Sequence, residues 1–114
     1  MLTTPGILRP SAQVRFLVDT GASHTCITPA IAHQANLRVL GLVPVHSTTQ
    51  QVLANTYLAD MLLPIGSPGY FIRDVQLSEL KLAGRFWDGL LGRDWLCKGH
   101  LFIDGLARTF TITI

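Results

Sequence analysis

The sequence predicts a small, closed, all-β domain, and three observations lead to this prediction. Most of the chain divides into short apolar and β-branched runs, and turn-forming residues separate these runs. The last run, Thr109 to Ile114, alternates strictly between threonine and apolar residues, as a half-buried strand does. Only two short stretches, which begin at Pro29 and at Arg93, have the composition of helices. Many short strands with tight connections are typical of closed barrels.

The first third of the chain is expected to contain two strands and a helix. Gln13 to Val18 is an apolar strand, and Thr25 to Thr28 continues as a β-branched strand. The last threonine of this run precedes Pro29, and an N-cap residue followed by proline is a typical helix start. Good helix formers follow at 30–35, and Asn36 can end the helix in a left-handed conformation.

The middle of the chain is expected to form a long hairpin and one further strand. Apolar runs and turn residues give these elements in order: a strand at Gly41 to His46, a strand at Val52 to Leu63, a turn at Gly66 to Gly69, and a strand at Tyr70 to Leu77. The polar stretch Ser47 to Gln51 is the tip of the candidate hairpin, which covers Leu42 to Leu63.

The last third is expected to contain a short strand, a helical turn and a second hairpin. Leu90 and Leu91 form the strand, and a helical turn covers Arg93 to Lys98, where a glycine ends it. His100 to Ile103 and Thr109 to Ile114 form the hairpin around Asp104-Gly105. An alternating terminal strand that stays unpaired promotes aggregation. We therefore expect it to pair with the same strand of a second copy.

The composition fits a single domain over residues 1–114 and excludes several classes of function. Apolar residues make up 48% of the chain and charged residues only 14%, which argues against disorder. The net charge of +2 is small and its lysines and arginines are scattered, so no nucleic-acid partner is expected. No apolar run is long enough to span a membrane. Met1 to Pro10 lacks the features of a signal peptide, so a cytoplasmic location is favoured, whether or not the domain was excised from a longer precursor.

Cys26 and Cys97 are the only cysteines, and both are expected to be buried thiols. Isolated cysteines without a neighbouring cysteine do not make a metal site, and His33, His46 and His100 show no ligand spacing. No metal or organic cofactor is therefore expected. A disulfide would need an oxidising compartment, which nothing in the sequence indicates.

The most informative feature is a carboxylate on a tight turn at the end of an apolar strand. This carboxylate, Asp19, lies within the segment Val18-Asp19-Thr20-Gly21-Ala22-Ser23-His24. Carboxylates are rarely left in such places unless they are hydrogen-bonded or used chemically. A second fragment of the same kind lies far downstream, with the sequence Asp88-Gly89-Leu90-Leu91-Gly92-Arg93-Asp94.

Carboxylates that hydrolyse peptide bonds work in pairs, so a single Asp19 per chain would need the Asp19 of a second chain. One carboxylate acts as base toward a water while the other donates a proton, and two like charges in close proximity share that proton. Of the seven acidic residues, only Asp19 lies in an Asp-Thr-Gly setting. A complete site therefore requires the two-fold axis of a homodimer. The structural alternative is that Asp19 is a turn carboxylate that accepts bonds from backbone N–H groups.

The two motifs together carry a resemblance to a known family. Phe16 to Ser23 resembles the active-site motif of the retropepsin-like aspartic proteases. Leu90 to Asp94 resembles their second signature, in which two apolar residues and a glycine precede a short helix. The spacing between the motifs has the size that single-lobed members use, and the hairpin Leu42 to Leu63 lies where the family has its flap. The resemblance implies an acid-protease-like barrel with a flap hairpin and one or two short helices.

The resemblance also implies a role for each motif residue. The protein would be an aspartic endopeptidase in which Asp19 of each subunit activates a water. Thr20 would form a hydrogen bond across the two-fold axis, and Gly21 would let the substrate backbone approach. Contacts with substrate would come from Ala22, Ser23, His24, Thr48, Thr49, Gln50, Leu90 and Leu91. Arg93 would stabilise the loop or the interface, and Thr109 to Ile114 would join an inter-subunit sheet, with residues near Met1 to Ile7 as candidate partners.

The chain departs from the family pattern at three places. Viral members usually carry, at the position of Ser23, an acidic residue that pairs with the arginine corresponding to Arg93, so Arg93 needs another partner here. The tip Ser47 to Gln51 has no glycine cluster. Ala22 lacks the hydroxyl that pepsins have, which removes a donor to the carboxylate and should move the pH optimum toward neutral. A different function also stays open: a non-catalytic module of the same fold for peptide binding or dimerisation.

Overall fold

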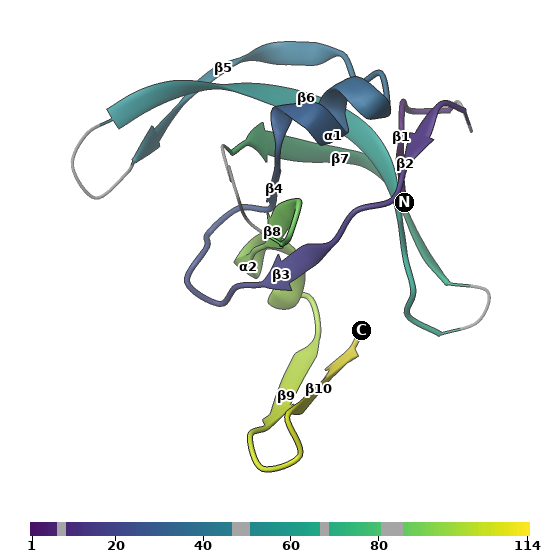
Figure 1. Cartoon of the computed structure of the whole chain (residues 1–114), viewed down its shortest axis with the longest axis vertical. Helices are drawn as coiled ribbons and strands as arrows, with labels where there is room; N and C mark the ends of the chain where they lie inside the picture. The colour runs from purple at the N-terminus through teal and green to yellow at the C-terminus, as the bar shows by residue number, and fades with distance from the viewer. Residues whose placement is uncertain (7–8, 47–50, 67–68, 81–85) are drawn as a thin grey trace.

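The computed structural model describes residues 1–6, 9–46, 51–66, 69–80 and 86–114, and most of its elements are strands (Figure 1). The strands in chain order are β1 (Leu2–Thr3), β2 (Ser11–Ala12), β3 (Phe16–Val18), β4 (Cys26–Ile27), β5 (Val39–His46), β6 (Gln51–Leu63), β7 (Tyr70–Glu79), β8 (Gly89–Leu91), β9 (His100–Asp104) and β10 (Thr109–Thr113). The helices are α1 (Pro29–Gln34) and α2 (Arg93–Leu96). The prediction of an all-β fold with one or two short helices is confirmed.

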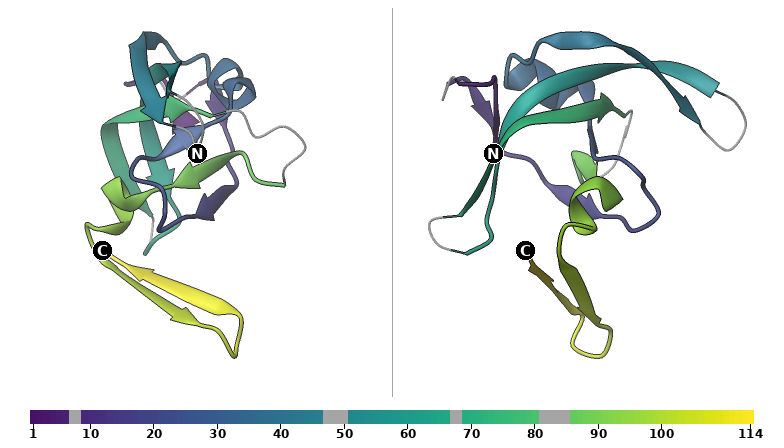
Figure 2. Two further views of the ribbon diagram at one scale, coloured as in Figure 1. Left: turned by 90° about the vertical axis from the view of Figure 1, so that its left-hand side faces the viewer. Right: turned by 180° about the vertical axis from the view of Figure 1, so that it is seen from behind.

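One curled sheet contains β1 to β8, in the order β2-β1-β6-β7-β4-β8-β3, and β5 also pairs with β6. Strands β2 and β3 lie at the two ends of this order, and no described strand bridges them (Figures 1 and 2). The predicted closed barrel is therefore not found in the described part of the chain. Strands β1, β2 and β3 have only two or three residues each, so they are too short to carry the hydrogen-bond ladder around the open side.

The three longest strands form an antiparallel meander. Strand β6 pairs with β5 from Val39↔Tyr57 to His46↔Gln51, and with β7 from Thr56↔Ser78 to Leu63↔Tyr70. The predicted long hairpin is thus present as β5 and β6. Its tip, which includes the predicted substrate contacts Thr48, Thr49 and Gln50, lies outside the described residues. Its action as a flap stays a prediction.

Helix α1 follows the local rules from which it was predicted. The Thr28 side chain accepts a hydrogen bond from the Ile31 backbone N–H, and Pro29 occupies the first turn. Just beyond the helix, Asn36 has a φ of 54°, which is the left-handed conformation expected there. Ile31 and Ala32 are buried and join the core. The helix covers one face of the meander (Figure 1).

The core gathers apolar side chains from the meander, from α1 and from the first strands. Its buried members are Leu2, Ala12, Ile27, Ile31, Ala32, Ala35, Tyr57, Ala59, Met61, Leu63, Ile72, Val75 and Leu77. Among the described residues, the largest fully buried side chains include Thr25 as well as apolar ones, although threonine is polar. A fully buried hydroxyl needs a hydrogen-bond partner, and this partner belongs to the candidate site described below.

The N-terminal strand is an integral part of the sheet. Strand β1 pairs with β2 on one side and with β6 on the other, and both Leu2 and Thr3 are buried. The Met1 ammonium also donates to the Leu62 carbonyl oxygen at 3.1 Å. The expectation that residues near Met1 are available to a sheet between subunits is not supported, because both edges of β1 are already used.

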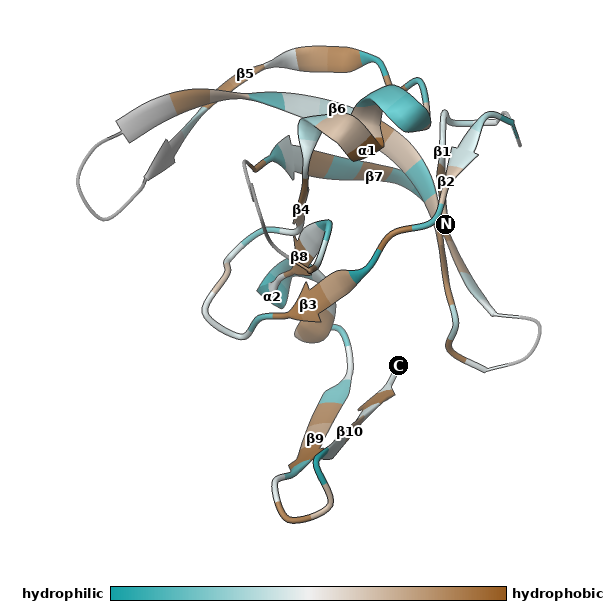
Figure 3. Ribbon diagram, in the orientation of Figure 1, coloured by the Kyte–Doolittle hydropathy of each residue, from teal (hydrophilic) through white to brown (hydrophobic). Residues whose placement is uncertain are grey.

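The C-terminal hairpin stands apart from the rest of the molecule. Strands β9 and β10 pair only with each other, from Asp104↔Thr109 to His100↔Thr113, and they project below the main sheet (Figures 1 and 2). Asp104 closes the turn by accepting bonds from the Leu106 and Ala107 N–H groups, both at 3.1 Å. The predicted hairpin around Asp104-Gly105 is confirmed. Figure 3 shows hydrophobic residues along β9 and β10. Of these, Phe102, Ile103 and Phe110 are exposed.

Candidate active site

The loop that carries Asp19 begins and ends on opposite sides of one strand. Strand β8 pairs in parallel with β3, which enters the loop, and antiparallel with β4, which leaves it. Leu90 is the central residue of β8 and lies opposite both Leu17 and Cys26. The loop of residues 19–25 therefore passes over the end of β8, and the second sequence motif lies directly beneath the first.

Asp19 is half-buried at the start of this loop. Its N–H donates to the Leu91 carbonyl oxygen at 3.0 Å, which extends the β3–β8 ladder by one bond. Its Oδ1 accepts a bond from the Gly21 N–H at 2.8 Å, and a side chain on Gly21 would lie only 3.1 Å from that oxygen. One backbone bond uses only part of the accepting capacity of a carboxylate, so Asp19 retains oxygen lone pairs for other partners.

The second motif holds the loop through Gly92 and Arg93. The Arg93 N–H donates to the Ala22 carbonyl oxygen at 2.8 Å, and its guanidinium Nη1 donates to the Thr20 carbonyl oxygen at 2.9 Å. Arg93 thus has a backbone carbonyl as its partner, where viral relatives use an acidic side chain. Gly92 lies so close to the loop that a Cβ there would be 2.7 Å from the carbonyl carbon of His24.

Thr25 and Asp94 close the far end of the loop. The Thr25 N–H donates to Asp94 Oδ2 at 2.9 Å, and its hydroxyl donates to Asp94 Oδ1 at 2.7 Å. The same hydroxyl oxygen accepts a bond from the Gly92 N–H at 3.0 Å. Thr25 has an exposed fraction of 0%. These bonds provide hydrogen-bond partners for the N–H and the hydroxyl of Thr25, the buried threonine described with the core.

The predicted site residues that the structure describes gather at one end of β3 and β8. Four loop residues are exposed: Thr20, Gly21, Ser23 and His24. Ala22 and Leu90 are half-buried, whereas Leu91 is buried beneath the loop. The loop therefore presents one carboxylate among small and polar groups at the surface, with apolar residues behind it.

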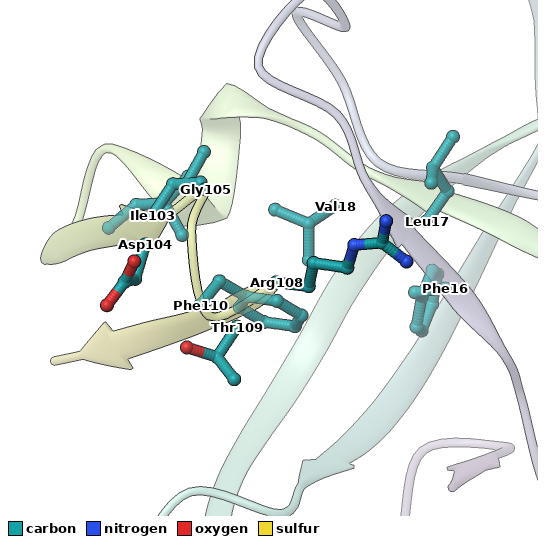
Figure 4. A pocket seen from close by; sticks show the side chains of 10 residues that line it. Phe16, Leu17, Val18, Ile103, Asp104, Gly105, Arg108, Thr109 and Phe110 are labelled. Carbon is teal, nitrogen blue, oxygen red and sulfur yellow. The ribbon is translucent and has the colours of Figure 1, made fainter.

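An apolar cavity of about 360 Å³ lies between β3 and the C-terminal hairpin. Its apolar lining comes from Phe16, Leu17 and Val18 on one side, and from the hairpin residues Leu101, Ile103 and Phe110 on the other. The Arg108 side chain reaches from the hairpin toward β3 (Figure 4). The cavity adjoins the strand that leads into Asp19.

Sequence reasoning missed two parts of this arrangement. Thr25 and Asp94 were not paired with each other, because their contact joins residues 69 positions apart and has no local signature. The cavity was not expected either, because it depends on where the hairpin folds back relative to β3. Asp94 lies in the predicted helical turn Arg93 to Lys98, and its Oδ1 also accepts a bond from the Trp95 N–H at 3.0 Å.

The two cysteines differ in their surroundings. Burial of the Cys26 thiol, together with smaller effects of the nearby Asp94 and Asp19 charges, raises its pKa to about 11. Cys97 is exposed, so the expectation of two buried thiols is wrong for this residue. It follows the end of α2, where Leu96 takes the buried position. Within the described residues, no group of three His, Cys, Asp or Glu side chains is placed to hold a metal ion.

Comparison with protein families agrees with this geometry. A family model described as aspartyl protease matches residues 10–95. The chain belongs to the aspartyl protease family. The match covers both motifs of this aspartyl protease domain and ends just before the C-terminal hairpin. No curated protein and no solved structure matches the chain. In the part of the chain that the structure describes, no helix is long and apolar enough to cross a membrane.

Proposed function

We propose that this protein is an aspartic endopeptidase that acts as a homodimer, with Asp19 of each copy at the two-fold axis. The observation that carries the proposal is the loop of residues 19–25, which presents the half-buried Asp19 carboxylate. Hydrogen bonds with Leu91, Gly92 and Arg93 hold this loop in place. Membership of the aspartyl protease family supports the same activity.

The chemistry follows from two like charges in close proximity. Two Asp19 carboxylates share one proton, so that one accepts a proton from the attacking water while the other donates to the carbonyl oxygen of the peptide. The proton taken from the water balances the one given to the carbonyl, and the tetrahedral intermediate then collapses with transfer of a proton to the leaving amine. Because Ala22 supplies no hydroxyl donor, we expect the pH optimum to lie nearer neutral, and a rate that peaks far below about pH 4 would contradict this.

The exposed loop residues are the proposed contacts with each other and with substrate. Thr20 would bond across the two-fold axis, and the small size of Gly21 would admit the peptide backbone. A peptide in extended conformation would lie along the loop and form backbone hydrogen bonds like an added strand. Ser23 and His24 would contact its side chains, with Leu90 behind them.

The C-terminal hairpin is the proposed contact between the two copies. A lone two-stranded hairpin is at best marginally stable in water, and this one exposes apolar residues such as Phe102, Ile103 and Phe110. Because both edges of β1 are occupied, the N-terminal strand does not complete its sheet. A second copy that covers the hairpin and the adjoining cavity would also bring its β3, and hence its Asp19 loop, toward the same axis.

Cleavage of an unbiased peptide library by the wild type and by Asp19→Asn, between about pH 3 and pH 8, tests the proposal. We expect the wild type alone to cleave, and a pepstatin-type inhibitor to abolish cleavage. Cleavage that survives the substitution would exclude this mechanism. If a folded, dimeric wild type cleaves nothing, the alternative of a non-catalytic peptide-binding or dimerisation module is favoured.

A further inference from the structure

We propose that Asp94 is a positioning residue for the active-site loop, which it controls by holding Thr25. The role rests on the proposed function of Asp19, but the contact itself is structural. Asp94 accepts bonds from the N–H and the hydroxyl of Thr25, the last residue of the loop, and from the Trp95 N–H. It therefore acts on the reaction through the shape of the loop.

Four consecutive residues, Leu91 to Asp94, hold the loop at both ends. Leu91 binds the N–H of Asp19 at 3.0 Å, at the first residue of the loop. Arg93 binds the carbonyl oxygens of Thr20 and Ala22 in the middle. Gly92 and Asp94 bind the last residue, Thr25. The two ends of the loop are thus fixed to one short rigid segment, which begins in β8 and ends in α2.

The Thr25 anchor depends on a side chain, whereas the Asp19 anchor depends only on backbone. Both donors of the buried Thr25, its N–H and its O–H, are directed to Asp94. A carboxylate makes shorter and stronger bonds than a neutral acceptor and has an oxygen for each donor. Without Asp94, two buried donors would lose their partner, which strongly disfavours the observed conformation.

The exposed middle of the loop has little packing of its own to maintain its shape. Thr20, Gly21, Ser23 and His24 are exposed, so the anchors determine where the backbone runs between them. Hydrolysis by paired carboxylates requires that both lie within hydrogen-bond reach of one water, and displacements on the order of 1 Å can reduce rates about 100-fold. Release of Thr25 is therefore expected to lower the rate of the chemical step.

A matched pair of substitutions separates positioning from ordinary stability. Thr25→Val removes a hydroxyl that donates to Asp94 and accepts from the Gly92 N–H. Thr28→Val removes a hydroxyl that caps α1, three residues farther along the chain and outside the loop. Both changes replace an oxygen by a methyl group and both are expected to lower the melting temperature. Only Thr25→Val is expected to change the loop.

The kinetic arm uses a peptide that the wild type cleaves, at temperatures where all variants are folded. For Thr25→Val we expect kcat to fall about 10- to 100-fold while KM changes about threefold or less. Thr25→Ser, which keeps the hydroxyl, should regain most of the rate. Thr28→Val should keep kcat within about twofold of the wild type. An equal fall in kcat for Thr25→Val and Thr28→Val would overturn the proposal.

Asp94→Asn gives a second, independent comparison. An amide can accept the bond from the Thr25 N–H, but its NH₂ would then face the Thr25 hydroxyl, whose proton would lose the acceptor that Asp94 Oδ1 provides. We expect a loss of kcat in the same direction as for Thr25→Val. The double variant should be no slower than the slower single variant, because both changes break the same bond between the Thr25 hydroxyl and Asp94. Additive losses would show that the two residues act separately and would contradict the proposal.

Hydrogen–deuterium exchange supplies a readout that does not need activity. In an Asp19→Asn background, Thr25→Val should speed exchange of the amides at residues 20–25, whereas Thr28→Val should leave them unchanged. Unchanged exchange in the Thr25→Val loop would overturn the positioning role. If the wild type cleaves no peptide, the proposed function fails, and the exchange result alone still decides whether Asp94 fixes the loop.

Discussion

At the residue scale, the candidate site depends on close approach between two segments that are far apart in sequence. Gly92 is the point of closest approach, because a Cβ there would be 2.7 Å from the carbonyl carbon and oxygen of His24 and 3.0 Å from the Ala22 carbonyl oxygen. These are backbone atoms, which cannot rotate away as a side chain can. The second motif therefore needs glycine at this position because there is no room for a Cβ atom. The conformational freedom of glycine is a secondary reason.

Gly92→Ala should displace the loop and remove most activity. We expect a loss of about 1–3 kcal/mol in unfolding free energy, as for overpacking of a core, and a fall in kcat of about 100-fold or more. Gly41→Ala is the matched control, because a Cβ at Gly41 meets nothing within 4 Å. Urea unfolding and peptide cleavage measure the two effects. Wild-type kinetics in Gly92→Ala would mean that the loop is not packed as described.

The thiols give a second prediction at this scale. Cys97 is exposed, whereas Cys26 is buried and its pKa is raised to about 11. Because the thiolate is the reactive form, a thiol reagent near pH 8 should modify one cysteine per chain in the folded protein and two in urea. Peptide mapping should place the fast modification on Cys97. Fast modification of Cys26 in the folded protein would contradict its burial.

The sequence was sufficient to predict contacts between residues that are close along the chain. It was not sufficient to predict contacts between residues that are far apart in the chain. The Asp-Thr-Gly motif and the apolar pair before Gly92 could be read from local patterns, and the resemblance to the family indicated that Arg93 lacks its usual acidic partner. The partner that Arg93 finds, the Thr20 carbonyl oxygen, could not be predicted, because a backbone acceptor leaves no trace in the sequence. The same reason hides the contact between Thr25 and Asp94.

At the element scale, a helix or strand could be predicted where its sequence pattern is long or where its capping residues act on their own neighbours. Helix α1 could be predicted almost to the residue, because Thr28, Pro29 and Asn36 each act on their own neighbours. The long strands β5, β6 and β7 were also predicted, with β7 extending to Glu79. Strands β1 and β2 were not, because two-residue strands have no periodicity and exist only through their pairing.

A polar contact between β6 and β7 predicts how stability depends on alkaline pH. Burial of Tyr57, together with its hydrogen bond to Glu79 at 2.6 Å, raises the pKa of the phenol to about 12. A raised pKa means that the folded state holds the phenolic proton more tightly than the unfolded chain, in which the pKa is about 10. This contribution is full below about pH 10 and is lost as the pH rises toward 12.

Tyr57→Phe should therefore change the pH dependence as well as the stability. We expect the wild type to exceed the variant in unfolding free energy by a constant amount below about pH 10, and this difference should shrink between about pH 10 and pH 12. Urea unfolding of both proteins across this range measures it. A difference that stays constant up to pH 12 would mean that Tyr57 has no raised pKa.

At the scale of the whole molecule, the described chain is an open sheet with an apolar hairpin beside it. The predicted closed barrel is not found in the described residues, because β2 and β3 lie at opposite ends of the strand order. The hairpin projects from the sheet with exposed apolar residues, and the proposed mechanism needs a second Asp19. The proposed second copy would account for both, because the cavity beside the hairpin is lined by β3, the strand that leads into Asp19.

A charge on the hairpin should separate the copies without unfolding them. We expect Phe110→Asp, at an exposed position that lines the cavity, to shift the protein to monomers and to remove peptide cleavage. Leu40→Asp is the matched control, since Leu40 is also an exposed apolar strand residue but lies on β5. Light scattering gives the mass of each variant. A Phe110→Asp protein that remains dimeric and active would place the interface elsewhere.

The pairing of two Asp19 residues can be tested most directly by titrating Asp19→Asn protein into a fixed amount of wild type and following peptide cleavage. If the site forms from two copies that exchange, mixed dimers hold only one aspartate and are inactive. The rate should then fall to about half at equal amounts and toward zero in excess of the variant. A rate that does not change as the variant is added would mean that one chain suffices, and would contradict the proposed mechanism.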